Sequence, residues 1–411
     1  MEQFQAIIIG AGPAGMMAAI RAAERGRKVL LIEQNSTPGK KLLISGKGRC
    51  NLTNTCDIKD FLDKFSKSRN FLRNTFAKFF NTQLYAFFQQ SRLKLKDERG
   101  GRVFPKSDRS GDILNALKSR LKNKHITVLL GERVREIILK DSQIEGVITH
   151  SGKQFLAPNI AVTTGGKSYP STGSTGDGYK IAKDLGHEII PLEPALSPVI
   201  IKEDFIKDWQ GIALKNVSAT LFSKGKKVDG RFGEMLFTHF GLSGPIILDL
   251  SASIYDALKL NNNAEISINF KPALDHKTLN GRLLREFKAD SKKSLKKIFN
   301  NLMPRGIIVR FLQYCGIDEN KIANQVTTEE RKKLVRGLLD LRLTAKGIMP
   351  LKDSIVTRGG VNTKQINPKT MESKLMKGLY FAGEVIDIDA KTGGYNMQAA
   401  FSTGWVCGDN I

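Results

Sequence analysis

The stretch FQAIIIGAGPAGMMAAIRAAERGRKVLLIEQN, residues 4–35, decides the fold. It reads as an apolar strand, a glycine-rich turn, an alanine-rich helix and a second apolar strand that ends at Glu33. In the turn, Gly10 allows a tight reversal, Gly12 lets the backbone approach a pyrophosphate, and Gly15 lets the helix pack closely on the strand. The start of the helix would offer N–H groups to phosphates, and Glu33 would accept hydrogen bonds from a ribose diol. The stretch therefore predicts a dinucleotide-binding unit.

Four further regions follow this unit. Residues 59–125 read as basic helices with interleaved phenylalanines, which we expect to be core more than a base-stacking surface. Residues 126–163 alternate as strands, and residues 192–270 are rich in strand and turn patterns. Residues 276–345 return to short basic helices, before a last strand and a helix from about Asn396.

The positive charge is large and uneven. The chain of 411 residues has 65 Lys and Arg against 40 Asp and Glu, a net charge of +25. Residues 59–140 hold 20 basic and 8 acidic side chains, and residues 271–352 hold 19 and 8. Clustered cations attract phosphate backbones, which favours a nucleic-acid partner. Solvated helix faces in a lysine-rich protein would give the same composition, so both interpretations stay open.

The cysteines and histidines do not form a metal pattern. Cys50, Cys56, Cys315 and Cys407 lie far apart without a CxxC pair, and the five histidines are scattered. We expect free thiols and no metal site. No apolar run approaches the length of a membrane span and no signal-peptide pattern is visible, so we expect a soluble, cytoplasmic protein with no membrane partner.

The stretch KGLYFAGEVIDIDAKTGGYNMQAAFSTGWVCG, residues 377–408, distinguishes between dinucleotides. An apolar strand ends at Gly383 and Glu384, acidic side chains follow, and Gly393 and Gly394 open a helix. A second acid and a second helix start suit a long ligand, because ribityl hydroxyls need an acceptor and flavin carbonyls need N–H donors. This pattern predicts FAD. A second GxGxxG unit is absent from the sequence, so NAD(P)H would dock transiently as the electron donor.

Several motifs together carry a family resemblance. They are GAGPAG, GKKLLISGKGRCNLTN, GRVFPKSDRSGDILNAL, TGGKSYPSTGSTGDGY, LFTHFGLSGPIIL, VTRGGV and the C-terminal stretch. From residue 4 to about residue 410, the chain resembles the bacterial HI0933-like (BaiN-like) FAD-dependent oxidoreductases. It departs from the family pattern at Lys47, where members usually carry glycine.

The resemblance implies an α/β fold. A glutathione-reductase-like FAD-binding Rossmann domain, residues 1–191 and 346–411, would be interrupted by residues 192–345. The insertion would hold a β-barrel over residues 192–270 and a small basic helical unit over residues 271–345.

The resemblance also assigns the loop of residues 39–54. This flexible, basic loop would run along FAD towards the isoalloxazine, with Lys41 and Arg49 facing the diphosphate or an anionic substrate. Cys50 and Asn51 would lie near the reactive end. Ser168 and Tyr169 would add hydroxyl contacts, unless their loop only closes onto the adenosine end. The motifs and the resemblance together predict these cofactor contacts: Gly10, Gly12, Pro13, Ala14, Gly15, Glu33, Lys41, Gly48, Arg49, Cys50, Asn51, Val134, Thr164, Gly165, Gly166, Gly383, Glu384, Asp387, Gly393, Gly394, Tyr395 and Asn396.

Two residues are candidates for chemistry. Cys50 is a candidate proton donor, because reduction of a polarised C=C bond needs an acid beside the carbonyl. The alternative is a small buried side chain, the commoner fate of a free cysteine. His239, in FTHFGLSGP, is a candidate for substrate binding or proton relay, and a structural, hydrogen-bonded histidine is the favoured alternative.

The expected activity is reduction of a conjugated C=C acceptor by a flavin hydride, with NAD(P)H as donor. A small-molecule substrate needs only an apolar pocket, but it leaves the charge unexplained. An RNA-modifying flavoenzyme that reduces uridine to dihydrouridine in ribosomal RNA is the alternative, because an extruded uracil presents a similar acceptor. An amine oxidase and a redox-inactive FAD-binding scaffold are further alternatives.

Overall fold

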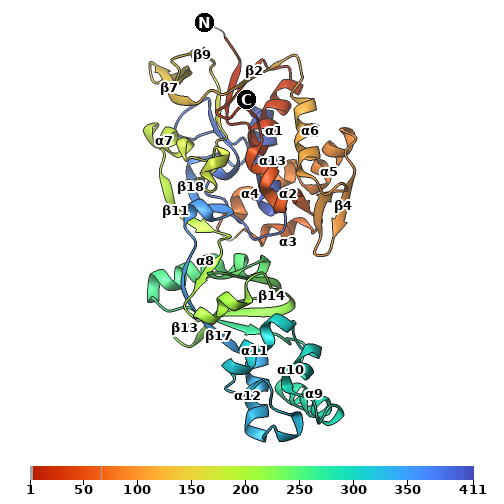
Figure 1. Cartoon of the computed structure of the whole chain (residues 1–411). Helices are drawn as coiled ribbons and strands as arrows, with labels where there is room; N and C mark the ends of the chain where they lie inside the picture. The colour runs from red at the N-terminus through yellow and green to blue at the C-terminus, as the bar shows by residue number, and fades with distance from the viewer. Residues whose placement is uncertain (1–2, 66) are drawn as a thin grey trace. The chain divides into compact units, whose positions relative to one another are not determined.

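The computed structural model describes residues 3–65 and 67–411. The chain forms two compact units, Met1–Pro194 with Leu351–Ile411, and Ala195–Pro350 (Figure 1). The first unit is thus built from both ends of the chain, and the second unit is an insertion. The predicted α/β fold class with an inserted barrel and helices is confirmed.

A parallel five-stranded sheet forms the centre of the first unit. Its strand order is β19-β10-β1-β2-β6, and each neighbouring pair is parallel. The strands are β1 (Ala6–Ile9), β2 (Val29–Glu33), β6 (Ile126–Leu130), β10 (Ile160–Val162) and β19 (Leu379–Phe381). Most of these residues are buried because both faces of the sheet are covered, which explains their continuous apolar runs. Parallel strands end at one edge, so Gly10, Glu33, Thr163 and Ala382 are gathered there.

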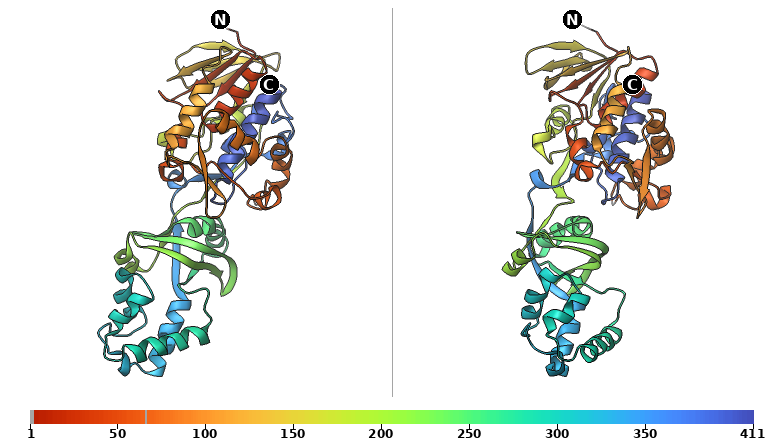
Figure 2. Two further views of the ribbon diagram at one scale, coloured as in Figure 1. Left: turned by 90° about the vertical axis from the view of Figure 1, so that its right-hand side faces the viewer. Right: turned by 45° about the vertical axis from the view of Figure 1, so that its right-hand side comes forward.

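Helices cover one face of this sheet, and a smaller antiparallel sheet covers the other (Figure 2). The helices of the first unit are α1 (Pro13–Glu24), α2 (Lys40–Gly48), α3 (Ile58–Leu62), α4 (Arg69–Lys78), α5 (Asn81–Gln90), α6 (Ser110–Arg120), α7 (Asp177–Asp184) and α13 (Tyr395–Asn410). The antiparallel sheet contains β7 (Val134–Lys140), β8 (Gln143–Thr149) and β9 (Gln154–Leu156). A two-stranded sheet pairs β11 (Ile189–Ala195) with β18 (Val356–Val361).

Helices α1 and α13, which come from opposite ends of the chain, pack closely against each other at two glycines of α13. A Cβ atom at Gly404 would overlap the carbonyl of Ala14, and one at Gly408 would overlap the carbonyl of Ala18. Only hydrogen at these positions lets the helix backbones approach so closely. The C-terminal helix therefore packs directly on the helix that follows the glycine-rich turn.

The phenylalanines between α3 and α5 form a core, as predicted. Seven of them are at most 9% exposed: Phe61, Phe65, Phe71, Phe76, Phe79, Phe87 and Phe88. The ring of Phe61 lies edge-on to Phe76 at 5.1 Å and to Tyr395 at 4.7 Å between centroids. The prediction that residues 59–125 are helical is only partly right. The stretch also contains β4 (Leu95–Glu98) and β5 (Arg102–Pro105), which join β3 (Thr53–Asn54) in a sheet.

The second unit contains a closed barrel of six strands in the order β12-β15-β14-β13-β16-β17. The strands are β12 (Val199–Ile201), β13 (Ala213–Ser223), β14 (Lys226–Thr238), β15 (Gly241–Ser243), β16 (Glu265–Asn269) and β17 (Leu341–Ile348). Its helices are α8 (Pro245–Asn261), α9 (His276–Ala289), α10 (Leu295–Ile298), α11 (Arg305–Tyr314) and α12 (Thr328–Leu339).

The barrel closes later in the chain than the sequence suggested. Residues 341–345 were expected to end the helical unit, but they begin β17, which pairs with β12 and β16. Leu341, Leu343 and Ala345 are buried at alternate positions, the period of a strand with one face in the core. The segment from α9 to α12 is therefore inserted between two barrel strands.

All four cysteines are free thiols. No helix within residues 3–65 and 67–411 combines the length and apolarity needed to cross a bilayer.

Candidate functional site

The glycine-rich turn between β1 and α1 leaves room for a ligand at one position. Gly15 is required by packing, because its Cβ would overlap the carbonyl oxygen of Gly10. Gly10 has φ +100° and lies against the Thr163 carbonyl, with 2.8 Å to an added Cβ. Gly12 differs, because its Cβ position meets no described atom within 4 Å. Packing does not explain this glycine, whereas close approach of a phosphate to the start of α1 does.

Glu33 is held at the end of β2, beside this turn. Its Oε2 accepts a 2.8 Å hydrogen bond from the Ala11 N–H group. Its Oε1 accepts from the backbone N–H of Asn35 at 2.9 Å and from the Asn35 side chain at 2.7 Å. These bonds orient the carboxylate at the mouth of the turn, where its remaining lone pairs suit a ribose. Asn35 was missed by the sequence analysis, although it follows the acid by two positions.

A second acid, Glu384, is surrounded by donors from distant parts of the chain. Its Oε2 accepts from Lys41 Nζ at 2.7 Å, and its Oε1 accepts from the Thr357 N–H at 2.8 Å. The Ser168 hydroxyl accepts from Lys41 Nζ at 2.6 Å and donates to Glu384 at 3.3 Å. A Cβ at Gly166 would overlap the Thr357 hydroxyl, so this glycine permits the cluster. Lys41 is thus ion-paired. Thr357 was overlooked, although the motif VTRGGV contains it.

The segment expected to be a flexible loop is helix α2, whose last residues, from Ser45 to Lys47, leave helical geometry and lead into a constrained turn at Cys50. Gly46, Lys47, Gly48 and Cys50 all have φ between +57° and +82°. This left-handed region strains most side chains other than glycine, so the backbone of Lys47 is strained here. The prediction of a flexible loop is therefore wrong for these residues.

Arg49 fixes this turn to the β4–β5 hairpin. Its Nε donates to Asp108 at 2.7 Å, and a second nitrogen pairs with Glu98. Its guanidinium also lies 4.1 Å from the centre of the Phe104 ring. The hydrogen bond from Arg49 lowers the pKa of Glu98. Arg49 therefore holds the turn in place by pairing with two carboxylates of the same unit.

Cys50 is fully buried in the core beside this turn. Burial raises the pKa of its thiol to about 12, against a smaller opposing effect of a hydrogen bond with Ser45. The thiol is thus protonated at neutral pH. Protonation suits a proton donor, while burial suits the alternative of a packed small side chain.

The 51–54 segment packs against the start of α13. With its amide oriented to satisfy its neighbours, Asn51 accepts from the Gly394 N–H at 3.0 Å and donates to the Thr53 carbonyl at 3.1 Å. Asn54 donates to the Gly393 carbonyl at 3.1 Å. The Thr53 hydroxyl is buried and has no partner among the described residues. The start of α13 therefore sits beside a polar segment with an unsatisfied donor.

Other predicted residues border the same sheet edge. A Cβ at Gly383 would lie 2.8 Å from that of Ala14, which places the C-terminal strand end beside Pro13 and Ala14. Thr164 and Gly165 follow β10, and Val134 begins β7. Asn396 donates to the Ala390 carbonyl at 2.9 Å. Burial raises the pKa of Asp387.

Tyr169 and His239 complete the predicted set. Tyr169 precedes a short helical turn at Pro170–Thr172 with φ +50°. His239 belongs to the second unit, where its side chain is exposed and its ring lies edge-on to Phe240 at 4.9 Å between centroids. The structure therefore describes His239 as a surface residue of that unit.

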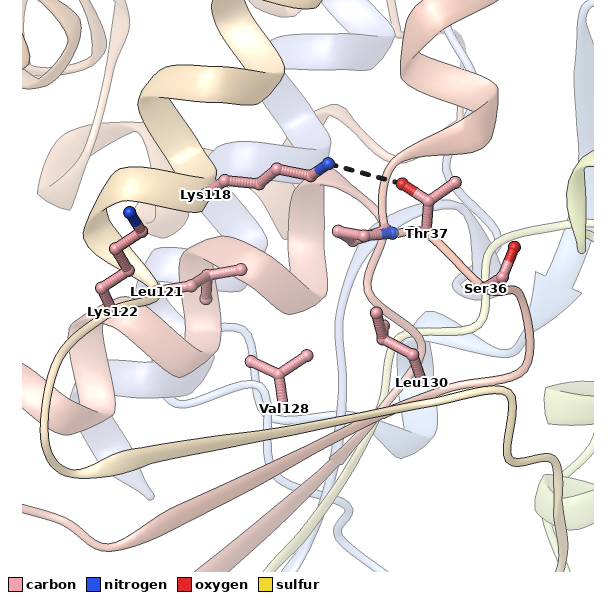
Figure 3. Close-up of a pocket in the computed structure, with 8 residues that line it drawn as sticks. Ser36, Thr37, Lys118, Leu121, Lys122, Val128 and Leu130 are labelled. Atoms are coloured by element: carbon pink, nitrogen blue, oxygen red, sulfur yellow. Dashed lines mark hydrogen bonds between the residues drawn. The ribbon is translucent and has the colours of Figure 1, made fainter.

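A separate pocket of about 250 Å³ opens beside α6 and β6 (Figure 3). Its lining residues are Ser36, Thr37, Pro38, Lys118, Leu121, Lys122, Val128 and Leu130. Lys118 Nζ lies 3.5 Å from the Thr37 hydroxyl. None of these residues belongs to the predicted cofactor contacts.

The residues of the first unit fit an extended dinucleotide. The open position at Gly12 and the oriented Glu33 suit a diphosphate and a ribose. The start of α13 and the unpaired Thr53 hydroxyl offer donors for a polar ring. In the described residues, no three His, Cys, Asp or Glu side chains gather as metal ligands would.

Comparisons with known proteins cover almost the entire chain. The HI0933-like protein Rossmann domain matches residues 4–410. The 3-dehydro-bile acid delta(4,6)-reductase of Clostridium scindens is 30% identical over 403 residues, 98% of this chain and 97% of the relative. The ribosomal RNA dihydrouridine synthase of Escherichia coli is 30% identical over 413 residues, 100% of this chain and 98% of the relative.

A solved structure shares the fold. The 3-ketosteroid delta1-dehydrogenase of Sterolibacterium denitrificans, in complex with 1,4-androstadiene-3,17-dione, has a TM-score of 0.53 at 13% identity. The match covers 99% of each chain.

Proposed function

Because the chain belongs to the HI0933-like family and is an FAD-dependent oxidoreductase, we propose that it reduces a uridine of ribosomal RNA to dihydrouridine. The C5=C6 bond of uracil is conjugated with a carbonyl, so it accepts a hydride and then a proton. FAD supplies the hydride when bound and reduced, and NAD(P)H supplies the two electrons. Ribosomes lie in the cytoplasm, where this proposal places the enzyme.

The observation that carries the choice of RNA is the charge. The net charge of +25 is concentrated in residues 59–140 and 271–352, and the second stretch includes helices α9 to α12 of the insertion. A small apolar substrate needs no such field, whereas an RNA backbone is held mainly by cations. The synthase named above is similar over the whole chain, which supports the same choice.

The first unit would hold FAD with its own residues. Gly12 and the start of α1 would bind the diphosphate, Glu33 the adenosine ribose, and the start of α13 the flavin ring. Glu384, oriented by Lys41, would accept from the ribityl chain. Cys50, whose thiol is protonated at neutral pH, would give the proton to the acceptor carbon.

Reduction of an unsaturated ketone of small size is the second candidate. Its support is the bile-acid reductase, which is as similar to this chain as the RNA enzyme. Both candidates use the same hydride and proton chemistry. They differ only in what brings the acceptor to the flavin.

Mass spectrometry of ribosomal RNA from a deletion strain tests the proposal. We expect loss of one dihydrouridine, with recovery on expression of the wild-type gene. Expression of the Gly12→Ala variant serves as the matched control, because it should fold without restoring the base. An identical nucleoside profile in the deletion and parent strains would reject RNA as the substrate and favour screening of unsaturated ketones.

A further inference from the structure

Helix α9 carries a row of cations along its outer face. Leu279, Leu283 and Phe287 are buried on the inner face. Lys277, Arg285 and Lys288 are exposed. Arg285 and Lys288 follow Lys277 by 8 and 11 residues, which is close to two and three helical turns. In the described part of the chain these three cations form no ion pair. We call Lys277, Arg285 and Lys288 the α9 cation row.

The acidic side chains nearby are already engaged. Glu286 lies 3.7 Å from Arg282 and accepts from Asn301 at 3.2 Å. Asp275 caps the helix by accepting from the Thr278 N–H at 2.7 Å. Asp290 pairs with Lys293 at 2.8 Å. These carboxylates therefore do not neutralise the α9 cation row, whose positive charge can attract an external anion.

Gly281 lies on the same face, and packing does not explain it. An added Cβ would meet only the guanidinium of Arg285, at an ordinary 3.7 Å. The other helical glycines of this unit are different, because a Cβ would lie 2.6 Å from Ile212 at Gly306 and 2.8 Å from the Cys315 sulfur at Gly337. Glycine inside an exposed helix is destabilising relative to alanine. A glycine without a packing role leaves a smooth surface on which a partner can approach the helix backbone.

Further cations continue from the end of α9. Lys292, Lys296 and Lys297 are exposed, and the described residues contain no ion pair to any of them. Figure 2 shows α9 at the periphery of the second unit. Protein interfaces are centred on buried aromatic anchors. Among the described residues, α9 exposes one large apolar side chain, Leu284, which is 44% exposed. The chemistry of this face suits a phosphate backbone better than a protein.

We propose that the α9 cation row, with Gly281 between its members, binds the phosphate backbone of the RNA substrate. This surface rests on the proposed function for the identity of its partner. Lysines and arginines on a smooth helix face position a nucleic acid without reading its sequence. The uridine to be reduced would then be chosen by the flavin site, and the α9 cation row would supply affinity.

Binding of transcribed ribosomal RNA by purified holoenzyme tests the surface. The row variant is Lys277→Glu/Arg285→Glu/Lys288→Glu, and the matched control is Lys180→Glu/Lys183→Glu/Lys377→Glu. The control makes the same change in net charge at exposed lysines of the first unit, outside both basic stretches. We expect the row variant to bind at least tenfold more weakly than the control. Its log–log salt slope should be shallower by about 2 to 3, since each lost phosphate contact removes roughly 0.7 to 0.9.

The Gly281→Gln variant separates surface shape from charge. Glutamine favours the helix, so the melting temperature should stay equal or rise, while RNA affinity should fall severalfold because the side chain blocks close approach. Equal affinity of the row variant and its control would overturn the inference, and so would wild-type binding that does not respond to salt.

The two proposals fail in distinguishable ways. If the deletion strain loses a dihydrouridine but the row variant binds RNA normally, the surface is wrong and the function stands. If the row variant loses RNA binding while the nucleoside profile of the deletion strain is unchanged, the surface stands and the function is wrong.

Discussion

Lys41 Nζ lies 2.7 Å from Glu384 Oε2, although 343 positions separate the two residues in the chain. Lys41 is at the start of α2, and Glu384 lies three residues after the end of β19. Ser168, fully buried, contacts both side chains. The pair therefore ties the start of α2 to the C-terminal part of the sheet edge, where the flavin would lie.

Lys41→Met should destabilise the first unit. The substitution removes a charged hydrogen bond from the partly buried carboxylate of Glu384 and should lower the free energy of unfolding by about 1.5 kcal/mol, measured by urea titration of the apoprotein. Lys40→Met is the matched control and should have little effect. A Lys41→Met/Glu384→Gln double variant should recover part of the loss, because it leaves no unpaired charge. Equal stability of Lys41→Met and wild type would contradict a structural role for the pair.

Gly12→Ala and Gly15→Ala should have opposite consequences. The Cβ at position 12 enters open space, so the apoprotein should keep its melting temperature but lose FAD, which is measured as the flavin-to-protein absorbance ratio. The Cβ at position 15 overlaps the Gly10 carbonyl, so that variant should misfold or melt at a much lower temperature. Full flavin content in Gly12→Ala would show that no phosphate lies over the turn.

Glu33→Ala should weaken FAD binding. A charged hydrogen bond to a ribose contributes on the order of 1.5 to 3 kcal/mol, so the dissociation constant measured by flavin fluorescence should rise about 10-fold to 150-fold. Glu33→Gln keeps the shape of the side chain, so its dissociation constant for FAD should lie between those of wild type and Glu33→Ala. Circular dichroism must show a folded protein, because Glu33 also accepts from Ala11 and Asn35. Unchanged affinity in the folded alanine variant would refute the adenosine-end assignment.

Cys50 should make stability fall at alkaline pH. Burial raises the pKa of its thiol to about 12 in the folded protein, whereas an unfolded thiol ionises near pH 8.5. Between these values the unfolded state binds fewer protons, so stability decreases as pH rises, by up to about 1.4 kcal/mol per pH unit. Urea unfolding at pH 8 and pH 10 should show a smaller pH effect in Cys50→Ser than in wild type. The other thiols are common to both proteins, so an identical pH effect would mean that Cys50 is accessible to solvent.

Cys50→Ala tests the chemical role of the same residue. If Cys50 gives the proton, the variant should bind FAD and be reduced by NAD(P)H at the normal rate, yet form product about two to four orders of magnitude more slowly. Anaerobic stopped-flow bleaching separates flavin reduction from product formation. Loss of bound flavin would instead assign Cys50 to packing of the turn.

Local patterns in the sequence were enough for the parts of the fold that depend on neighbours along the chain. The strand β1, the turn GAGPAG, helix α1 and the strand β2 were predicted almost residue by residue, because each has its own periodicity and its own end signal. The start of α13 near Asn396 was predicted for the same reason. The glycines and the terminal acid of this first unit also indicated a dinucleotide before any contact was known.

Contacts between distant segments could not be predicted in this way. The pairing of Lys41 with Glu384, the placement of Arg49 on Glu98 and Asp108, and the closure of the barrel by β17 each join residues far apart in sequence. The difference between Gly12 and Gly15 has the same origin, since the two glycines look alike in the motif and only their surroundings separate them. Periodicity reports which face of an element is buried, but it contains no information on which other element covers that face. That choice depends on side-chain volume and charge complementarity summed over the folded chain, and these exist only once the chain is packed.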